Sequence, residues 1–179
     1  MEQAIKIQYY QSPYGELIIG SYNGQICLCD WRYRKGRAII DLRIQKSLNA
    51  QYSEGDSDII QKTICQLNEY FNRQRNQFDI PLLLIGTEFQ KSVWNMLLQI
   101  PYGTTDTYLG LSERINNVKA IRAVAAANGA NAISIIIPCH RIIGSNRQLI
   151  GYAGGLNTKK KLLELESYIQ TPELNFDAE

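Results

Sequence analysis

Residues 4–31 alternate apolar and polar positions between turn residues, a pattern that leaves few possible folds. Most of the segment has the sequence IKIQYYQSPYGELIIGSYNGQICLCDW, interrupted by Pro13, Gly15 and the pair Asn23-Gly24. A period of two is typical of strands with one buried face, and Asn-Gly favours the two-residue type I′ turn of a hairpin. We therefore predict an antiparallel meander, which continues through the basic segment WRYRKGRAII.

The spacing of apolar residues changes after Asp58. Ile60, Ile64, Leu67 and Phe71 recur at i, i+4, i+7 and i+11, which is typical of an amphipathic helix. An extended segment, QFDIPLLLIG, follows this helix. The sequence thus predicts an α+β first domain over residues 1–85.

A second, mostly helical domain is predicted over residues 86–170. Thr87 suits the N-cap of a helix EFQKSVWNMLLQI that ends before Pro101. Two short helices, 107–115 and 118–129, are separated only by Asn116 and Asn117, which predicts a helix-turn-helix. An apolar strand, AISIIIPCH, and a helix capped by Asn157 complete the domain. The polar, acidic tail at 171–179 is expected to be flexible.

The composition is that of a globular protein, with 45% hydrophobic and 20% charged residues. No apolar run approaches the roughly 18 to 20 residues that span a bilayer, and the N-terminus lacks the pattern of a signal peptide. A cytoplasmic location without a membrane partner is therefore expected. The four cysteines are expected to be reduced thiols.

Positive charge is concentrated in the second domain. Residues 107–161 contain eight lysines and arginines against Glu113 alone, a net charge of +7. Such an asymmetry is expected of a surface that meets a polyanion such as nucleic acid, although a solvated basic face would look the same. Arg122 stands out, because it is a long cation on a helix made mostly of alanine.

The only histidine of the chain, His140, follows Cys139 directly. A cysteine is a nucleophile only as the thiolate, which a base or a positive neighbourhood favours. Pro138 should end the strand and expose Cys139, and a water or a turn would have to join the thiol to the imidazole. A buried core cysteine beside a satisfied histidine is the alternative.

The other cysteines are predicted to be structural. Cys27 and Cys29 share one face of a strand, and Cys65 is expected on the buried side of its helix. A metal site of Cys27, Cys29, Cys139 and His140 is conceivable but lacks the usual paired spacing. No metal and no cofactor are therefore expected.

The segment IPCHRII, with RAVAAANGAN before it and GYAGGLNTKKKLLELE after it, resembles the O6-alkylguanine-DNA alkyltransferases, also called methylated-DNA-protein-cysteine methyltransferases. The resemblance extends from TEFQKSVWNMLLQIPYGT to Glu166. It implies a ribonuclease-H-like N-terminal domain with an antiparallel sheet and a C-terminal domain with the helix-turn-helix. It also implies a repair protein that flips an alkylated guanine out of double-stranded DNA and moves the alkyl group from O6 to its own cysteine, once per molecule. O4-alkylthymine is expected as a second substrate, and the protein is expected to act as a monomer.

The resemblance also implies a role for individual residues. Cys139 would be the acceptor, His140 would take its proton through a water, Glu166 would orient the imidazole, and Tyr108 would donate to the leaving guanine near N3. The residues implied in DNA binding through the minor groove are the finger Arg122, Asn117, Lys119, Ser145 and the hinge residue Asn131. Those implied in the substrate pocket are Tyr152, Ala153 and Gly154.

Two features of this chain depart from the family pattern. GANA replaces a common Gly-Arg-Asn-Pro at 129–132, and Ala153 replaces a serine of some relatives. Two other kinds of protein remain as alternatives. A lesion-binding relative without transfer would lack the acceptor cysteine, whereas a cysteine hydrolase would need an oxyanion hole that the sequence does not reveal.

Overall fold

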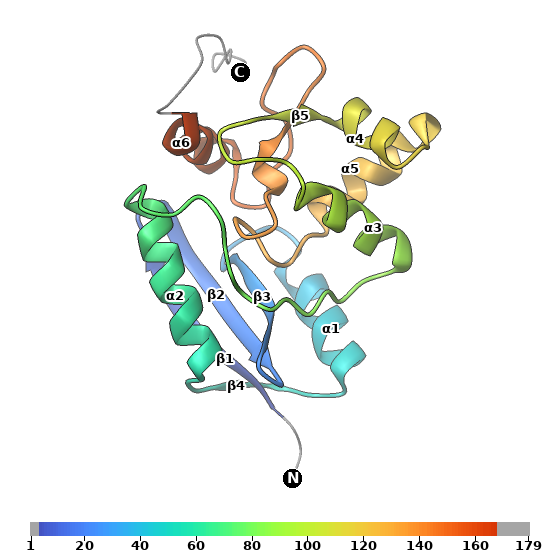
Figure 1. Cartoon of the computed structure of the whole chain (residues 1–179). Coiled ribbons are helices and arrows are strands. Elements are labelled where there is room, and N and C mark those ends of the chain that lie inside the picture. The colour runs from blue at the N-terminus through green and yellow to red at the C-terminus, as the bar shows by residue number, and fades with distance from the viewer. Residues whose placement is uncertain (1–3, 168–179) are drawn as a thin grey trace. The chain divides into compact units, whose positions relative to one another are not determined.

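Three antiparallel strands form the start of the chain, as predicted. A computed structural model describes residues 4–167, and β1 (Ile5–Ser12), β2 (Gly15–Tyr22) and β3 (Gln25–Trp31) pair in chain order (Figure 1). Asn23 and Gly24 both have positive φ, 48° and 77°, as a type I′ turn requires. β1 shows the expected alternation of buried and exposed residues, whereas β2 and β3 are buried at consecutive positions and so on both faces.

The basic segment after β3 does not continue the meander, so that prediction was wrong. It leads into α1 (Arg37–Leu48), which is followed by a short strand β4 (Tyr52–Glu54). β4 pairs with β1 in parallel, giving the sheet order β3-β2-β1-β4. The helical period was hidden because α1 buries Ile40 and Ile44 but leaves the equally apolar Ile39 and Leu42 exposed.

The predicted helix from Asp58 is present as α2 (Asp58–Phe71), which lies against β1 and β2 (Figure 1). Ser57 caps it by accepting a hydrogen bond from the amide of Ile60. The buried face of α2 is rotated about the helix axis relative to the predicted face, and it includes two polar residues. The buried residues of α2 are Ile60, Thr63, Gln66, Leu67 and Tyr70.

The cysteine predictions for this unit are confirmed in part. Cys65 is exposed, because the rotated face of α2 turns it to solvent, so its predicted packing role was wrong. Cys27 and Cys29 are buried as predicted, and burial raises the pKa of the Cys27 thiol to about 12. Both thiols therefore stay protonated and pack in the hydrophobic core.

The remaining helices and a two-stranded sheet make up the rest of the structure. α3 (Glu88–Leu97) has the predicted N-cap Thr87, whose bonds with Gln90 form a capping box, and it ends three residues before the predicted end. α4 (Tyr108–Arg114) is followed by the 3₁₀ turn η1 (Val118–Ala120) and by α5 (Ile121–Gly129). β5 (Asp106–Thr107) pairs in parallel with β6 (Ile142–Ile143), and α6 (Leu156–Glu166) starts after Gly155 rather than at the expected cap Asn157.

Residues 132–138 form a buried loop and not the predicted strand. Ile133, Ile135 and Ile137 are at most 2% exposed, so the apolar pattern identified burial correctly. The backbone bonds are local: the amide of Ile136 donates to Ser134 and that of Ile137 to Ile133. Ile135 has a φ of 72°, which no regular strand contains.

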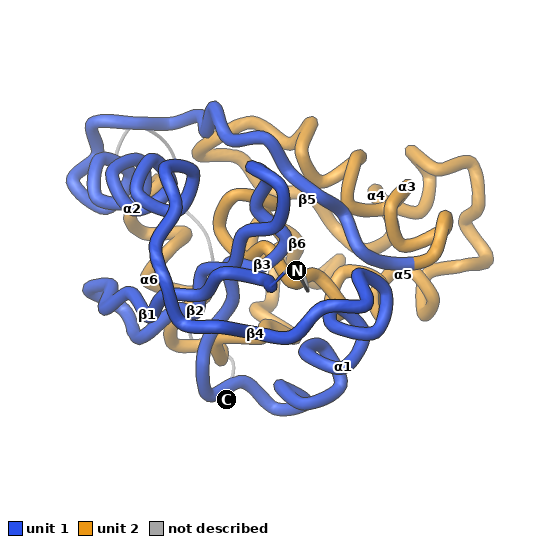
Figure 2. Tube along the Cα trace, turned by 90° about the horizontal axis from the view of Figure 1, so that it is seen from below, with its two compact units in different colours: residues 1–86 blue, residues 87–179 orange. Residues whose placement is uncertain are grey.

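The chain divides into two compact units, residues 1–86 and 87–179 (Figure 2). The first contains the four-stranded sheet with α1 and α2, and the second contains α3 to α6 with the two-stranded sheet. The expected flexible tail at 171–179 lies outside the described residues. Within residues 4–167, no helix combines the length and the apolar character needed to cross a membrane.

Candidate active site

Cys139 begins a single 3₁₀ turn, η2 (Cys139–Arg141), directly after Pro138. Its amide donates to the carbonyl of Ile137 at 2.8 Å, which turns the chain at the end of the buried loop. The residue is only 3% exposed. The expectation that the proline would expose the thiol was therefore wrong, because the turn that begins at Cys139 is buried like the loop before it.

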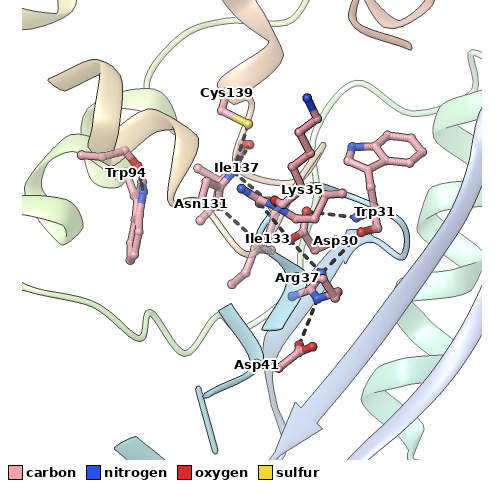
Figure 3. A network of polar contacts seen from close by, with 12 residues as sticks. Asp30, Trp31, Lys35, Arg37, Asp41, Trp94, Asn131, Ile133, Ile137 and Cys139 are labelled. Atoms are coloured by element: carbon pink, nitrogen blue, oxygen red, sulfur yellow. Dashed lines mark hydrogen bonds and ion pairs between the residues drawn. The ribbon is translucent and has the colours of Figure 1, made fainter. Parts of the chain in front are cut away.

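Asn131 is the side chain that holds this loop against the sulfur (Figure 3). Its Nδ2 lies 3.2 Å from Sγ of Cys139 and 3.0 Å from the carbonyl oxygen of Ile137. Its Oδ1 accepts from the amide of Ile133 at 2.9 Å. Asn131 is 1% exposed. It thus connects the end of α5 to the cysteine and offers the sulfur a hydrogen-bond donor.

His140 and Glu166 form a fully buried pair. Nε2 of His140 lies 2.7 Å from Oε1 of Glu166, and the two residues are 0% and 2% exposed. Since a carboxylate only accepts hydrogen bonds, this contact places the imidazole proton on Nε2. Nδ1 is buried and has no hydrogen-bond partner among the described residues. The imidazole therefore keeps one nitrogen lone pair available to a proton.

Arg141 completes the network from the other side of the carboxylate. Its guanidinium binds Glu166 in a bidentate manner, with Nε 2.8 Å from Oε2 and Nη2 3.0 Å from Oε1. Nη1 donates to the carbonyl of Ile100 at 2.6 Å. Such a fork fixes the orientation of the carboxylate as well as its charge.

The charges of this network follow from burial and from the partners. Burial lowers the pKa of His140, although the carboxylate of Glu166 acts to raise it. The imidazole is therefore neutral near pH 7. Burial acts to raise the pKa of Glu166, but His140 and Arg141 outweigh it and hold that pKa well below its usual range. The pair is therefore a neutral imidazole held by an ionised carboxylate.

Two tyrosines lie beside the cysteine and the histidine. Tyr108, the first residue of α4, donates from its hydroxyl to the carbonyl of Ile150 at 3.2 Å. Burial raises the pKa of its phenol to about 12, with a further contribution from Cys139. The ring of Tyr152 meets that of His140 edge-on at a centroid distance of 6.3 Å. Ala153 and Gly154 follow it, also half-buried.

The residues predicted to bind DNA divide into two groups. Arg122, Lys119 and Asn117 are exposed along η1 and the first turn of α5, and Ser145 is exposed in the loop after β6. Asn131, by contrast, is buried at the sulfur. Val118 and Ile121 add exposed apolar side chains beside Arg122, at 52% and 37% exposure. Helix α5 is anchored to α3 by the indole of Trp94, which donates to the carbonyl of Ala127 at 2.8 Å (Figure 3).

Two of the eight basic residues counted between residues 107 and 161 are buried, so they do not contribute to a positive surface. Arg141 is 6% exposed and Lys159 is fully buried. The sequence contained a clue for Lys159, because residues 159, 162, 163 and 166 follow the spacing of one helix face that includes two leucines. The same spacing could have identified Glu166 as buried. No group of three or more metal-binding side chains occurs within residues 4–167.

The fold and the site together define a protein of two units, in which the helical unit places one buried thiol beside a histidine, glutamate and arginine network. Residues 5–84 match the model of the 6-O-methylguanine DNA methyltransferase ribonuclease-like domain, and residues 88–168 match the model of its DNA binding domain. The chain belongs to the 6-O-methylguanine DNA methyltransferase family.

Individual relatives agree with this membership. A methylated-DNA--protein-cysteine methyltransferase of Haemophilus influenzae is 42% identical over 165 residues, which cover 91% of this chain and 87% of the relative. One of the same name from Methanosarcina acetivorans is 55% identical over 101 residues, 56% of this chain and 65% of the relative, just under two thirds of its length. The crystal structure of Mycobacterium tuberculosis OGT in complex with DNA is 36% identical, with a TM-score of 0.79 and coverage of 90% and 92% of the two chains.

Proposed function

We propose that this protein repairs DNA by moving a methyl or larger alkyl group from O6 of guanine to Sγ of Cys139, in a single turnover. The observation that carries the proposal is the buried sulfur, which receives a hydrogen bond from Asn131 at 3.2 Å and is followed by a histidine locked onto Glu166. The family and its named relatives support the same chemistry. O4-alkylthymine is proposed as a second substrate.

In the proposed reaction Cys139 attacks as the thiolate. Its proton passes to Nδ1 of His140 through a water, since Nδ1 is the ring nitrogen that has no hydrogen-bond partner within residues 4–167. Glu166 holds the imidazole in this tautomer and stabilises the cation that forms, while Arg141 holds Glu166. A new bond forms between sulfur and the alkyl carbon as the bond from that carbon to O6 breaks. The electron pair stays with the guanine.

The leaving guanine needs a proton donor, and Tyr108 is the proposed one. Its phenol stays protonated because its pKa is raised to about 12, so it can donate to N3 as negative charge develops on the purine. Tyr152, Ala153 and Gly154 are proposed to line the pocket that receives the base. The presence of Cys139 argues against a protein that binds the lesion without repairing it.

DNA is proposed to meet η1 and α5 as the turn and second helix of a helix-turn-helix that enters the minor groove. The exposed cations Arg122 and Lys119 support this orientation, and Arg122 is proposed to fill the gap left by the flipped nucleotide. Asn117 and Ser145 are proposed to contact the backbone. We propose that the protein acts as a monomer in the cytoplasm, where a reducing environment keeps its cysteines as thiols.

One experiment tests the transfer directly. The protein is mixed with duplex DNA containing O6-methylguanine, digested and weighed by mass spectrometry. We expect one methyl group on the peptide that contains Cys139 and none after Cys139→Ala, which should still bind the duplex. Unmodified DNA serves as the control, and an unchanged mass of the parent peptide would refute the proposal.

A further inference from the structure

Lys159, in the first turn of α6, is a buried cation that the mechanism above does not use. It is fully buried, and its Nζ donates to the carbonyls of Ile142, Ile150 (2.8 Å) and Gly151 (3.1 Å). An ammonium group has three hydrogens, so all of them are used. Burial lowers the pKa of Lys159 to about 8. A charge this costly to bury is expected only where such bonds compensate it.

The three carbonyls belong to the two segments that border the acceptor site. Ile142 directly follows η2, which contains the cysteine, the histidine and the arginine of the network. Ile150 and Gly151 directly precede Tyr152, whose ring meets that of His140 edge-on. The ammonium of Lys159 therefore joins the segment that carries the sulfur to the segment proposed to form the base pocket.

The carbonyl of Ile150 has a second donor, the hydroxyl of Tyr108. A carbonyl oxygen has two lone pairs and can accept both bonds. If Tyr108 turns to N3 of a bound guanine, the bond from Lys159 remains, so the carbonyl of Ile150 keeps a hydrogen-bond donor.

We propose that Lys159 is a positioning residue for alkyl transfer. It holds the Ile150–Gly151 segment against β6, and it leaves the hydroxyl of Tyr108 free to exchange the carbonyl of Ile150 for the substrate. The inference rests on the proposed function, because it requires Tyr108 to act on guanine. Lys159 acts through the backbone and through Tyr108.

The charge of Lys159 acts on both groups of the proposed proton transfer. The ionisable groups that interact with it are Cys139 and His140 of η2: its charge attracts a thiolate at Cys139 and opposes a proton on His140. Tyr108 of α4 shares its acceptor, and Arg141 and Glu166 border His140 on the other side. Lys160 and Lys161 follow it on its own helix. A neutral Lys159 should therefore disfavour the thiolate at Cys139, while it would make His140 a stronger base.

The test is a double-mutant cycle on the rate of methyl transfer. Lys159→Met removes the charge and all three bonds, and we expect a loss of at least about tenfold at pH 7. Tyr108→Phe should also slow transfer, and the double variant should be at most about threefold slower than the slower single variant, because both act through one carbonyl. Lys46→Met, an exposed lysine of α1, is the matched control and should transfer at the parent rate.

A second measurement needs no variant and so does not depend on how Lys159→Met folds. The transfer rate of the parent with O6-methylguanine as the free base should fall above about pH 8, as Lys159 loses its proton. A rate that rises or stays level up to pH 10 would overturn the inference, as would a full rate in Lys159→Met or multiplicative losses in the cycle. Failure of the parent to gain any methyl group refutes the proposed function itself, and the inference with it.

Discussion

Nε2 of His140 lies 2.7 Å from Oε1 of Glu166, although 26 residues separate them and neither is more than 2% exposed. This contact decides which imidazole nitrogen can accept a proton, since the carboxylate occupies the other one. It also places an ionised carboxylate in the interior, where Arg141 and His140 must compensate it. The pair therefore affects both stability and the proposed reaction.

Glu166→Gln should lower the free energy of unfolding at pH 7 by about 3 kcal/mol, because it leaves Arg141 buried without its counter-charge. Urea unfolding measures this loss. Glu164→Gln, an exposed position on the same helix, is the control and should change the value by less than about 0.5 kcal/mol. Equal effects of the two substitutions would contradict the importance of the buried pair.

The stabilisation by Glu166 should depend on pH with a definite sign. Because the pKa of its carboxyl is lower in the folded protein than its ordinary value of 4.5, the unfolded chain binds this proton more tightly. The stabilisation is complete above pH 4.5 and is lost as pH falls below it. The difference between parent and Glu166→Gln should therefore narrow below pH 4.5 in urea unfolding, whereas a constant difference would contradict the pKa direction.

Tyr108→Phe should slow methyl transfer about tenfold to a hundredfold, since it removes the proposed donor to the guanine. The ratio of parent to variant rates should be constant from pH 6 to pH 10, because the pKa of the phenol is about 12. Single-turnover kinetics over this range measure the ratio, with the exposed Tyr33→Phe as control. A ratio that collapses below pH 10 would indicate that Tyr108 ionises and is not the donor.

Arg122→Ala should slow repair of O6-methylguanine in duplex DNA about tenfold or more, because it removes the side chain proposed to support the extruded nucleotide. Transfer from the free base should keep the parent rate, since nothing is extruded there. Parallel rate measurements on the two substrates give the comparison, with Lys46→Ala as control. Equal losses on both substrates would contradict the proposal that Arg122 supports the extruded nucleotide.

Gly110→Ala should destabilise the protein by about 1 to 3 kcal/mol, because the new Cβ would lie 2.2 Å from Oδ1 of Asp106. Asp106 also accepts from Arg114 at 2.7 Å and so cannot move without cost. Gly129→Ala in α5 is the control, since its Cβ would meet nothing within 4 Å. Thermal unfolding should show a lower Tm for the first variant and an unchanged or higher Tm for the second.

The elements that could be predicted were those with a strong local pattern. The meander, the Asn23-Gly24 turn and the cap Thr87 each depend on a few neighbouring residues, and the structure has all three. Helix α1 was missed because its exposed face contains Ile39 and Leu42, which removes the amphipathic contrast. The strand predicted at 132–138 is a loop, because its isoleucines are buried by the tertiary fold rather than by a sheet.

The site was predictable to a smaller extent. The order Cys139, His140 draws attention to the thiol, but adjacency in sequence does not show that Asn131 contacts the sulfur or that Glu166 contacts the imidazole. These contacts join residues 8 and 26 positions apart, and they depend on tertiary packing. The resemblance identified Glu166, and its spacing from the leucines of α6 could also have shown that it is buried. Lys159 was counted as a surface charge because two further lysines follow it.

Ile135 adopts a φ of 72° in the loop that leads to Cys139. A β-branched residue in this region costs about 1 to 3 kcal/mol, so the loop is held in a conformation that its own sequence disfavours. The packing of the surrounding core must compensate this conformational free energy. Substitutions that loosen this core should therefore shift the nucleophile before they unfold the domain, and inactivation would then precede melting.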